Sequence, residues 1–138
     1  MNNRLILQQH APYATMLNKS LDFCELLLSR SSLLYPFALT TVENEIHCVF
    51  VPSNAQSANS EMIEALQILL DEHQKTAKNS ANLLVYPATV THPNSTECDA
   101  LIFAINDTQG HNTVTIYPYE HVENGIKIKQ PYTCDFSD

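Results

Sequence analysis

Apolar side chains recur at helical spacing in two segments of the chain. A period of 3.6 residues places positions three, four and seven apart on one face of a helix, which then packs on a core. The first segment covers residues 13–31 and follows Pro12, a residue that suits the first position of a helix. The second covers residues 60–75, with Ser57 or Ser60 as its cap. The predicted apolar stripes consist of Tyr13, Met16, Leu17, Leu21, Phe23, Cys24, Leu27 and Leu28 in the first helix, and Met62, Leu66, Leu69, Leu70 and His73 in the second.

The remaining apolar segments are rich in Val, Ile, Thr and Phe, which are typical of β-strands. We expect the tail from Pro131 to be irregular. Asn124-Gly125 is the strongest turn signal, because both residues tolerate a positive φ. Strands joined by such short turns pair antiparallel. The six predicted strands cover residues 37–42, 46–51, 83–90, 99–106, 113–122 and 126–129.

This order of elements predicts an α+β fold in which two helices flank a single, mostly antiparallel sheet, in the order α-β-β-α-β-β-β-β. The chain has 138 residues, the size of one ordinary domain, and we expect residues 1–138 to form a single domain. The strand over residues 99–106 is apolar on both faces, so we expect it in the centre of the sheet. Pro87 predicts an edge strand or a bulge, because proline cannot donate to a ladder.

Pairing across the last two turns predicts a break in strand register. If Asn106 faces His111, then Phe103 and Leu101 share the core face with Val114 and Ile116. If the last turn pairs Glu123 with Ile126, Ile126 and Ile128 share the opposite face. Because side chains alternate strictly along a strand, both hairpins reach one core only if an extra residue intervenes. We therefore expect a β-bulge or a bend at Tyr117-Pro118.

Three short motifs resemble those of a family of small uncharacterised bacterial proteins. They are Tyr35-Pro36-Phe37-Ala38 before a hairpin, Asp99-Ala100 at the start of a strand and Tyr117-Pro118-Tyr119 at the end of one. The resemblance covers about residues 26–130. The chain departs from it at Asn44, where the family usually has glycine. The element order is also similar to that of roadblock and profilin-like domains, and these resemblances imply a fold without a function.

Charge excludes two classes of partner. The chain has 7 basic and 15 acidic residues, a net charge of −8. Nucleic-acid binding requires clustered Lys and Arg, and anionic membrane surfaces attract the same residues, so we expect neither partner. No segment has the roughly 18 apolar residues of a membrane span or the apolar core of a signal peptide. We therefore expect a cytoplasmic protein whose four cysteines are reduced.

Glycine content excludes several enzyme classes. The chain has two glycines, Gly110 and Gly125. P-loops, dinucleotide-binding turns, kinase glycine-rich loops and nucleophile elbows need several glycines close together, because backbone approaches the ligand with unusual φ values. No such motif exists here, and we expect no cofactor.

Histidines and cysteines offer weak candidates for chemistry. The six histidines, at positions 10, 47, 73, 92, 111 and 121, are at least ten residues apart, whereas zinc ligands are usually closer, so we expect no metal site. His47 and Cys48 are adjacent on a strand and so point to opposite faces. A catalytic Cys48 would need His92, His111 or His121 instead. Other candidates are Glu97-Cys98-Asp99, whose alternative is a polar strand entry, and the carboxylates of Asp71-Glu72 and of Glu43 and Glu45, which we expect to face solvent.

The most informative candidate site is formed by Tyr117, Tyr119 and His121. On the predicted register they end a strip of small residues on one face of the sheet. Either a helix covers this strip, or it binds a partner or ligand, a role for which tyrosine is well suited. We expect a non-enzymatic cytoplasmic protein-interaction module, regulatory or toxin-neutralising, that binds a protein partner or self-associates as a homo-oligomer. The alternative is a small-ligand-binding domain or minor enzyme with a pocket near these three residues.

Overall fold

The computed structural model describes residues 2–30, 34–42, 45–50, 59–76, 81–91, 96–107 and 112–135. It confirms the predicted α+β fold and order of elements and adds a strand at the end, where we expected an irregular tail. The elements are α1 (Asn2–Arg30), β1 (Phe37–Val42), β2 (Glu45–Val49), α2 (Asn59–Thr76), β3 (Ala81–Thr91), β4 (Glu97–Asp107), β5 (Asn112–Val122), β6 (Gly125–Ile128) and β7 (Tyr132–Asp135).

The strands form one antiparallel sheet in the order β2-β1-β3-β4-β5-β6, with β7 also paired to β5. β4 lies in the centre of this order, as its two apolar faces predicted. Phe103 on one face is fully buried, and Ile102 on the other is 6% exposed. The continuous apolar run of β4 therefore reflects burial on both sides of the sheet.

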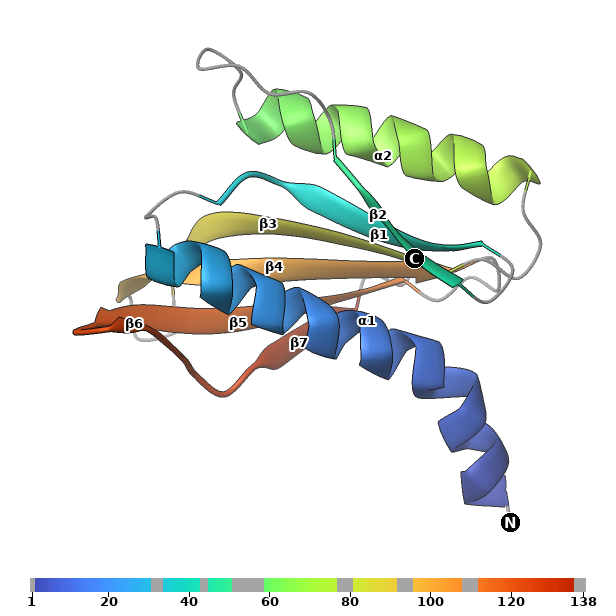
Figure 1. Cartoon of the computed structure of the whole chain (residues 1–138), viewed down its shortest axis with the longest axis horizontal. Helices are drawn as coiled ribbons and strands as arrows, with labels where there is room; N and C mark the ends of the chain where they lie inside the picture. The colour runs from blue at the N-terminus through green and yellow to red at the C-terminus, as the bar shows by residue number, and fades with distance from the viewer. Residues whose placement is uncertain are drawn as a thin grey trace.

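The two helices cover opposite faces of the sheet (Figure 1). α1 presents a buried line of small and apolar side chains at helical spacing, and the larger core lies beneath it. α2 presents Leu66 and Leu70 to a smaller core with Ala38 and Leu84. The core beneath α1 consists of Met16, Cys24, Leu28, Leu34, Phe37, Leu39, Ala81, Leu83, Val85, Leu101, Phe103, Tyr119 and Ile126.

α1 extends further toward the N-terminus than predicted. It begins at Asn2 and continues through Pro12, so Pro12 is not its first residue. A proline inside a helix removes one backbone hydrogen bond and bends the helix without necessarily ending it. Figure 1 shows α1 bending between its first turns and the part that lies on the sheet. The N-terminal turns therefore extend beyond the sheet.

Pro87 lies in a continuous β3–β4 ladder, so the predicted bulge is absent from these strands. Pro87 pairs with Leu101 of β4. On the other side, β1 pairs with β3 only as far as Phe37 opposite Val85. β3 is thus a central strand up to Val85 and an edge strand beyond it, and Pro87 falls in the edge part. The prediction of an edge strand at Pro87 is therefore confirmed for the part of β3 beyond Val85.

The predicted β4–β5 register was wrong by one residue. Asn106 pairs with Asn112, and the ladder continues without interruption to Asp99 opposite Tyr119. No bulge or bend interrupts β5 at Pro118, which pairs with Ala100. The shift exchanges the two faces of β5 relative to β4. Tyr117 and Tyr119 therefore share the core face beneath α1, and Ile116 lies on the opposite face.

The segment that links β6 and β7 is one residue longer than the stretch of β5 that it runs beside. Tyr119 pairs with Ile128, and Ile116 pairs with Tyr132. Three steps along β5 (119 − 116) are therefore matched by four steps in its partner (132 − 128). The Lys129 N–H donates to the Pro118 carbonyl at 2.7 Å within this interruption. With the observed β4–β5 register, Tyr119 and His121 already share the core face with Ile126 and Ile128, so the predicted need for an extra residue in β5 was wrong. The one-residue mismatch lies instead in the edge segment, which is paired on one side alone.

The last hairpin turns one residue earlier than predicted. Val122 pairs with Gly125, so Glu123 and Asn124 form the turn and the predicted pairing of Glu123 with Ile126 was wrong. Gly125 has a φ of +152°, which side chains rarely tolerate. A Cβ at this position would also lie 2.7 Å from the Ser29 Oγ of α1. Glycine is needed there because of this φ, and the Ser29 contact places the end of α1 directly on the start of β6.

Candidate functional site

Tyr117, Tyr119 and His121 lie on one face of β5, on the side of the sheet that α1 covers. Tyr119 is 7% exposed and belongs to the main core. Tyr117 is partly buried, with its ring centroid 5.1 Å from that of Phe103. His121 is the accessible member, since 52% of its side chain is exposed. The structure thus brings the three predicted binding residues onto one face, where α1 covers the two tyrosines.

A small polar group surrounds Tyr119. Asp99 pairs directly with Tyr119 across the β4–β5 ladder, and its Oδ2 lies 4.0 Å from the His121 Nε2. The Tyr119 and His121 rings meet edge to face at 5.7 Å. Burial raises the pKa of Tyr119, and the charge of Asp99 and the nearby Cys24 raise it further. The hydroxyl therefore stays protonated at neutral pH and can act as a hydrogen-bond donor.

Cys24 completes this group without giving it nucleophilic chemistry. Its side chain is fully buried on α1, and burial raises the pKa of the thiol to about 12. The thiolate is the nucleophilic form, so a thiol that stays protonated at neutral pH is inert. Among the residues that the structure describes, no group of three His, Cys, Asp or Glu side chains is arranged to hold a metal ion.

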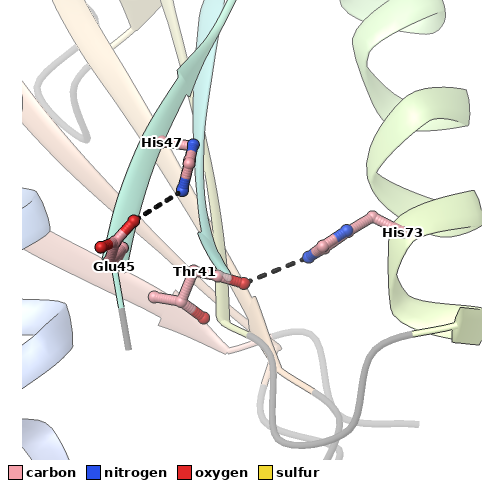
Figure 2. A network of polar contacts seen from close by, with 4 residues as sticks. All are labelled: Thr41, Glu45, His47 and His73. Carbon is pink, nitrogen blue, oxygen red and sulfur yellow. Dashed lines mark hydrogen bonds and ion pairs between the residues drawn. The ribbon is translucent and has the colours of Figure 1, made fainter. Parts of the chain in front are cut away.

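Among the described residues, no histidine lies beside Cys48 on its own face of the sheet. His47 points to the opposite face, as strand alternation predicted, and its Nε2 lies 3.5 Å from the Glu45 Oε2 (Figure 2). His121 lies on β5, which β1, β3 and β4 separate from β2. Four strand spacings correspond to roughly 19 Å, too far for proton transfer. The other two partners that we considered, His92 and His111, lie outside the described residues.

His47 and His73 flank the same hairpin and have separate partners. Figure 2 shows His73 reaching from α2 to β1, where its Nε2 lies 3.1 Å from the Thr41 carbonyl oxygen. The next residue, Gln74, donates from its Nε2 to the Asn106 Oδ1 of β4 at 3.3 Å. His73 therefore fixes α2 toward β1 and Gln74 fixes it toward β4. The contact has a structural role and sets the rotation of α2 about its axis.

This rotation exposes a flank of α2 that the sequence analysis assigned to the core. Leu69 precedes His73 by one turn and lies on the side of the helix away from Gln74, which is the side of β1 and β2. Leu69 is 44% exposed, although we predicted it in the buried stripe. Its neighbour Ile68 is 53% exposed. The stripe prediction failed here because α2 buries a narrow face that is centred on Leu66 and Leu70.

A second exposed apolar group lies at the same edge of the sheet, on the face that α1 covers. Phe50 follows β2 directly and is 56% exposed. Its ring lies 5.9 Å from that of Phe37 and 6.1 Å from that of Phe23 on α1. Leu26, one turn further along α1 from Phe23, is 48% exposed. β2 is thus flanked by Phe50 on one face of the sheet and by Leu69 of α2 on the other.

The strand between these groups is itself open. β2 is the last strand on its side of the described sheet and pairs with β1 alone. Its sequence, Glu45-Ile-His-Cys-Val49, contains no lysine or proline. Cys48 is an exposed, unpaired thiol on the same face as Ile46. We name this surface the β2 edge and define it as Glu45–Val49 with Phe50 and Leu69.

Sequence reasoning missed the β2 edge because no local signal separates it from the core. Phe50, Leu26 and Leu69 are the residue types that cores contain. An available clue was the absence of lysine from one terminal strand, but the sequence does not reveal which strands are terminal.

Comparison with known proteins finds no matching family model, no matching curated protein and no matching solved structure. The resemblances inferred from the sequence therefore stay predictions. Neither helix among the described residues is long and apolar enough to cross a membrane.

Proposed function

We propose that the chain is a non-enzymatic, cytoplasmic protein-interaction module that binds an extended polypeptide along the β2 edge. The observation that carries this proposal is the open strand β2, flanked on both faces of the sheet by exposed apolar side chains. A terminal strand presents unpaired N–H and C=O groups that a second strand can satisfy. The exposed side chains of Phe50 and Leu69 then supply apolar area beside the new strand.

The titratable groups support binding over catalysis. The Cys24 thiol stays protonated because burial raises its pKa to about 12. Burial also raises the pKa of the exposed-edge thiol, Cys48, and no described histidine lies beside it on its face. Covalent catalysis needs a nucleophile with an adjacent base, and neither cysteine has one among the described residues.

The experiment compares three tagged proteins as baits in extract of the native host. They are the wild type, Cys48→Lys at the β2 edge, and Val122→Lys as a matched control. Val122 is 46% exposed and lies on the far side of the sheet. A lysine on a terminal strand disfavours pairing, because a docked strand would bury its charge.

We expect the wild type and Val122→Lys to retain the same polypeptides and Cys48→Lys to lose them. Circular dichroism of each bait establishes that it is folded. Equal retention by all three folded baits would contradict the proposal.

A further inference from the structure

The two outer edges of the sheet differ in how many strands they can accept. β2 offers five consecutive strand residues and no lysine. The opposite edge is split into β6 and β7, and it carries Lys127 and Lys129 around the interruption. Lysines and interruptions prevent a further strand from pairing. Beyond Val85, β3 also has a free edge, but that part contains Pro87, which disfavours pairing. Among the described edges, β2 is therefore the one without lysine, proline or an interruption.

Pairing through a single edge of this kind favours a closed pair over a fibre. An antiparallel pair of identical strands is related by a two-fold axis, so the same surface is used twice and β2 is no longer open. A two-fold axis at His47 pairs all five residues of β2. Glu45 then lies opposite Val49 of the second copy, and Ile46 lies opposite Cys48 of the second copy. Because paired positions differ by an even number, each face of the sheet continues across the junction.

Side-chain chemistry suits this self-pairing on both faces. On the face toward α1, Ile46 and Cys48 of one copy would meet Cys48 and Ile46 of the other, which makes two compact apolar pairs. On the face toward α2, Glu45 and His47 already lie 3.5 Å apart within one chain. Pairing at His47 places each histidine diagonal to Glu45 of the second copy, within the reach of long side chains. The junction would then hold the two imidazoles opposite each other at its centre, with a Glu45 carboxylate on either side of them as a hydrogen-bond acceptor.

We infer that the strand bound at the β2 edge is β2 of a second copy of this chain, which gives a two-fold homodimer with one continuous sheet. This inference rests on the proposed function, and it names the partner. Phe50 would lie next to the junction, where pairing reduces its contact with water.

The first test measures the mass of the purified full-length protein by sedimentation in reductant, at concentrations from about 1 to about 100 µM. Dimers of moderate affinity have dissociation constants in this range. We expect the wild type and Val122→Lys to shift from monomer to dimer with the same midpoint. We expect Cys48→Lys to raise the dissociation constant roughly 100-fold or more, because its charge would be buried without a partner. A wild-type protein that stays monomeric throughout would overturn the homodimer.

The second test needs no destabilising variant. Amide hydrogen exchange of β2 is measured on the wild type at the two ends of the same concentration range. Residues 45–49 should exchange more slowly in the concentrated sample, and β6 should be unchanged. Equal exchange of β2 at both concentrations would overturn the inference even if a dimer forms elsewhere.

The third test determines the register. Ile46→Cys, oxidised gently, should give a covalent dimer in which residue 46 of one chain is linked to Cys48 of the other, because directly opposed positions bring the two Cβ atoms close. A dimer linked only through residues outside β2 would contradict the pairing.

The outcomes separate this inference from the proposed function. A monomeric wild type whose capture of a host polypeptide is lost in Cys48→Lys would overturn the homodimer and leave the interaction module standing. A monomeric wild type that captures nothing through β2 would overturn both.

Discussion

The two edges of this sheet are built from similar strands and reach opposite outcomes. At one edge, β6 and β7 return along β5, and α1 ends on the same hairpin, so Ile126 is 7% exposed. At the other edge, β2 is the last described strand and Phe50 beside it is 56% exposed. The comparison shows that an edge is closed by interrupting the strand, charging it and covering it with a helix. β2 is uninterrupted and carries no lysine, and neither helix ends on it.

The charges make the same distinction. At the closed edge, the Lys129 Nζ lies 3.4 Å from the Glu120 Oε2, and both side chains are about half exposed. At the open edge, the corresponding pair is His47 with Glu45. A lysine ammonium group is compact and strongly hydrated. Strand pairing therefore costs more desolvation at the closed edge than at the open one.

The largest expected effect distinguishes the buried Cys24 beneath α1 from the exposed Cys48 at the β2 edge. Burial raises the pKa of Cys24 from 9.0 to about 12, so the unfolded chain loses this proton first as pH rises. The buried thiol therefore stabilises the fold in full below about pH 9. This stabilisation, about 4 kcal/mol, is lost as the pH rises from about 9 to about 12. Urea unfolding across this range should show a shallower alkaline loss of stability in Cys24→Ala than in the wild type. The exposed Cys48 provides the control. Cys48→Ala should lose unfolding free energy with rising pH more nearly as the wild type does than Cys24→Ala.

Truncation of Ile126 tests whether the closed edge is part of the core. Ile126→Ala removes buried methyl groups beneath α1 and should lower the free energy of unfolding by about 3 kcal/mol. The control Val122→Ala, on the exposed end of the same hairpin, should cost about 0.5 kcal/mol or less. Denaturant titration of dilute protein measures both values. Equal costs would show that α1 does not seal this edge.

Gly125 tests the close approach of α1 to β6. Gly125→Ala should cost about 1–2 kcal/mol, because an alanine there adopts a positive φ. The added Cβ also meets the Ser29 Oγ, but a serine hydroxyl can rotate away. Adding Ser29→Ala should therefore recover only a small part of the loss. Full recovery in the double variant would show that the contact, rather than φ, requires glycine.

The smallest effect concerns the ion pair of the closed edge. Glu120→Gln should change the free energy of unfolding by about 0.5 kcal/mol or less, because both partners are half exposed. A double-mutant cycle with Lys129→Gln, repeated in high salt, measures the interaction. A coupling that survives high salt would mean that the pair is more sheltered than its exposure indicates.

Local sequence signals determined the elements, and they did so because those signals act over a few residues. The strand over 37–42 was predicted with the observed bounds, and the second helix was predicted within one residue at each end. The 3.6-residue stripe around Cys24 likewise identified the face that α1 buries. β7 was missed because its four residues are too short to show a period. The N-terminal part of α1 was missed because Pro12 is a start signal and a tolerated kink at once.

The candidate site depended on a single residue of register. Shifting the partner of Asn106 from His111 to Asn112 moved Tyr117 and Tyr119 from the face opposite the predicted core to the core beneath α1. Turn chemistry between the two strands did not encode this choice. The burial of Phe103 and Tyr117 on one face encodes it, and that burial exists only once α1 is in place. A binding role for Tyr117, Tyr119 and His121 stays a prediction.

The sequence by itself determined the fold class, the two amphipathic helices and the central position of β4, because each follows from periodicity or composition within one segment. The tertiary structure decided which strands are terminal, because β1 leaves β2 on its outer side and pairs with β3, whose sequence lies beyond α2. It also decided that Leu69 and Phe50 face solvent while Tyr119 does not. Exposure of an apolar side chain depends on what packs against it from distant parts of the chain, and a local pattern does not contain that information.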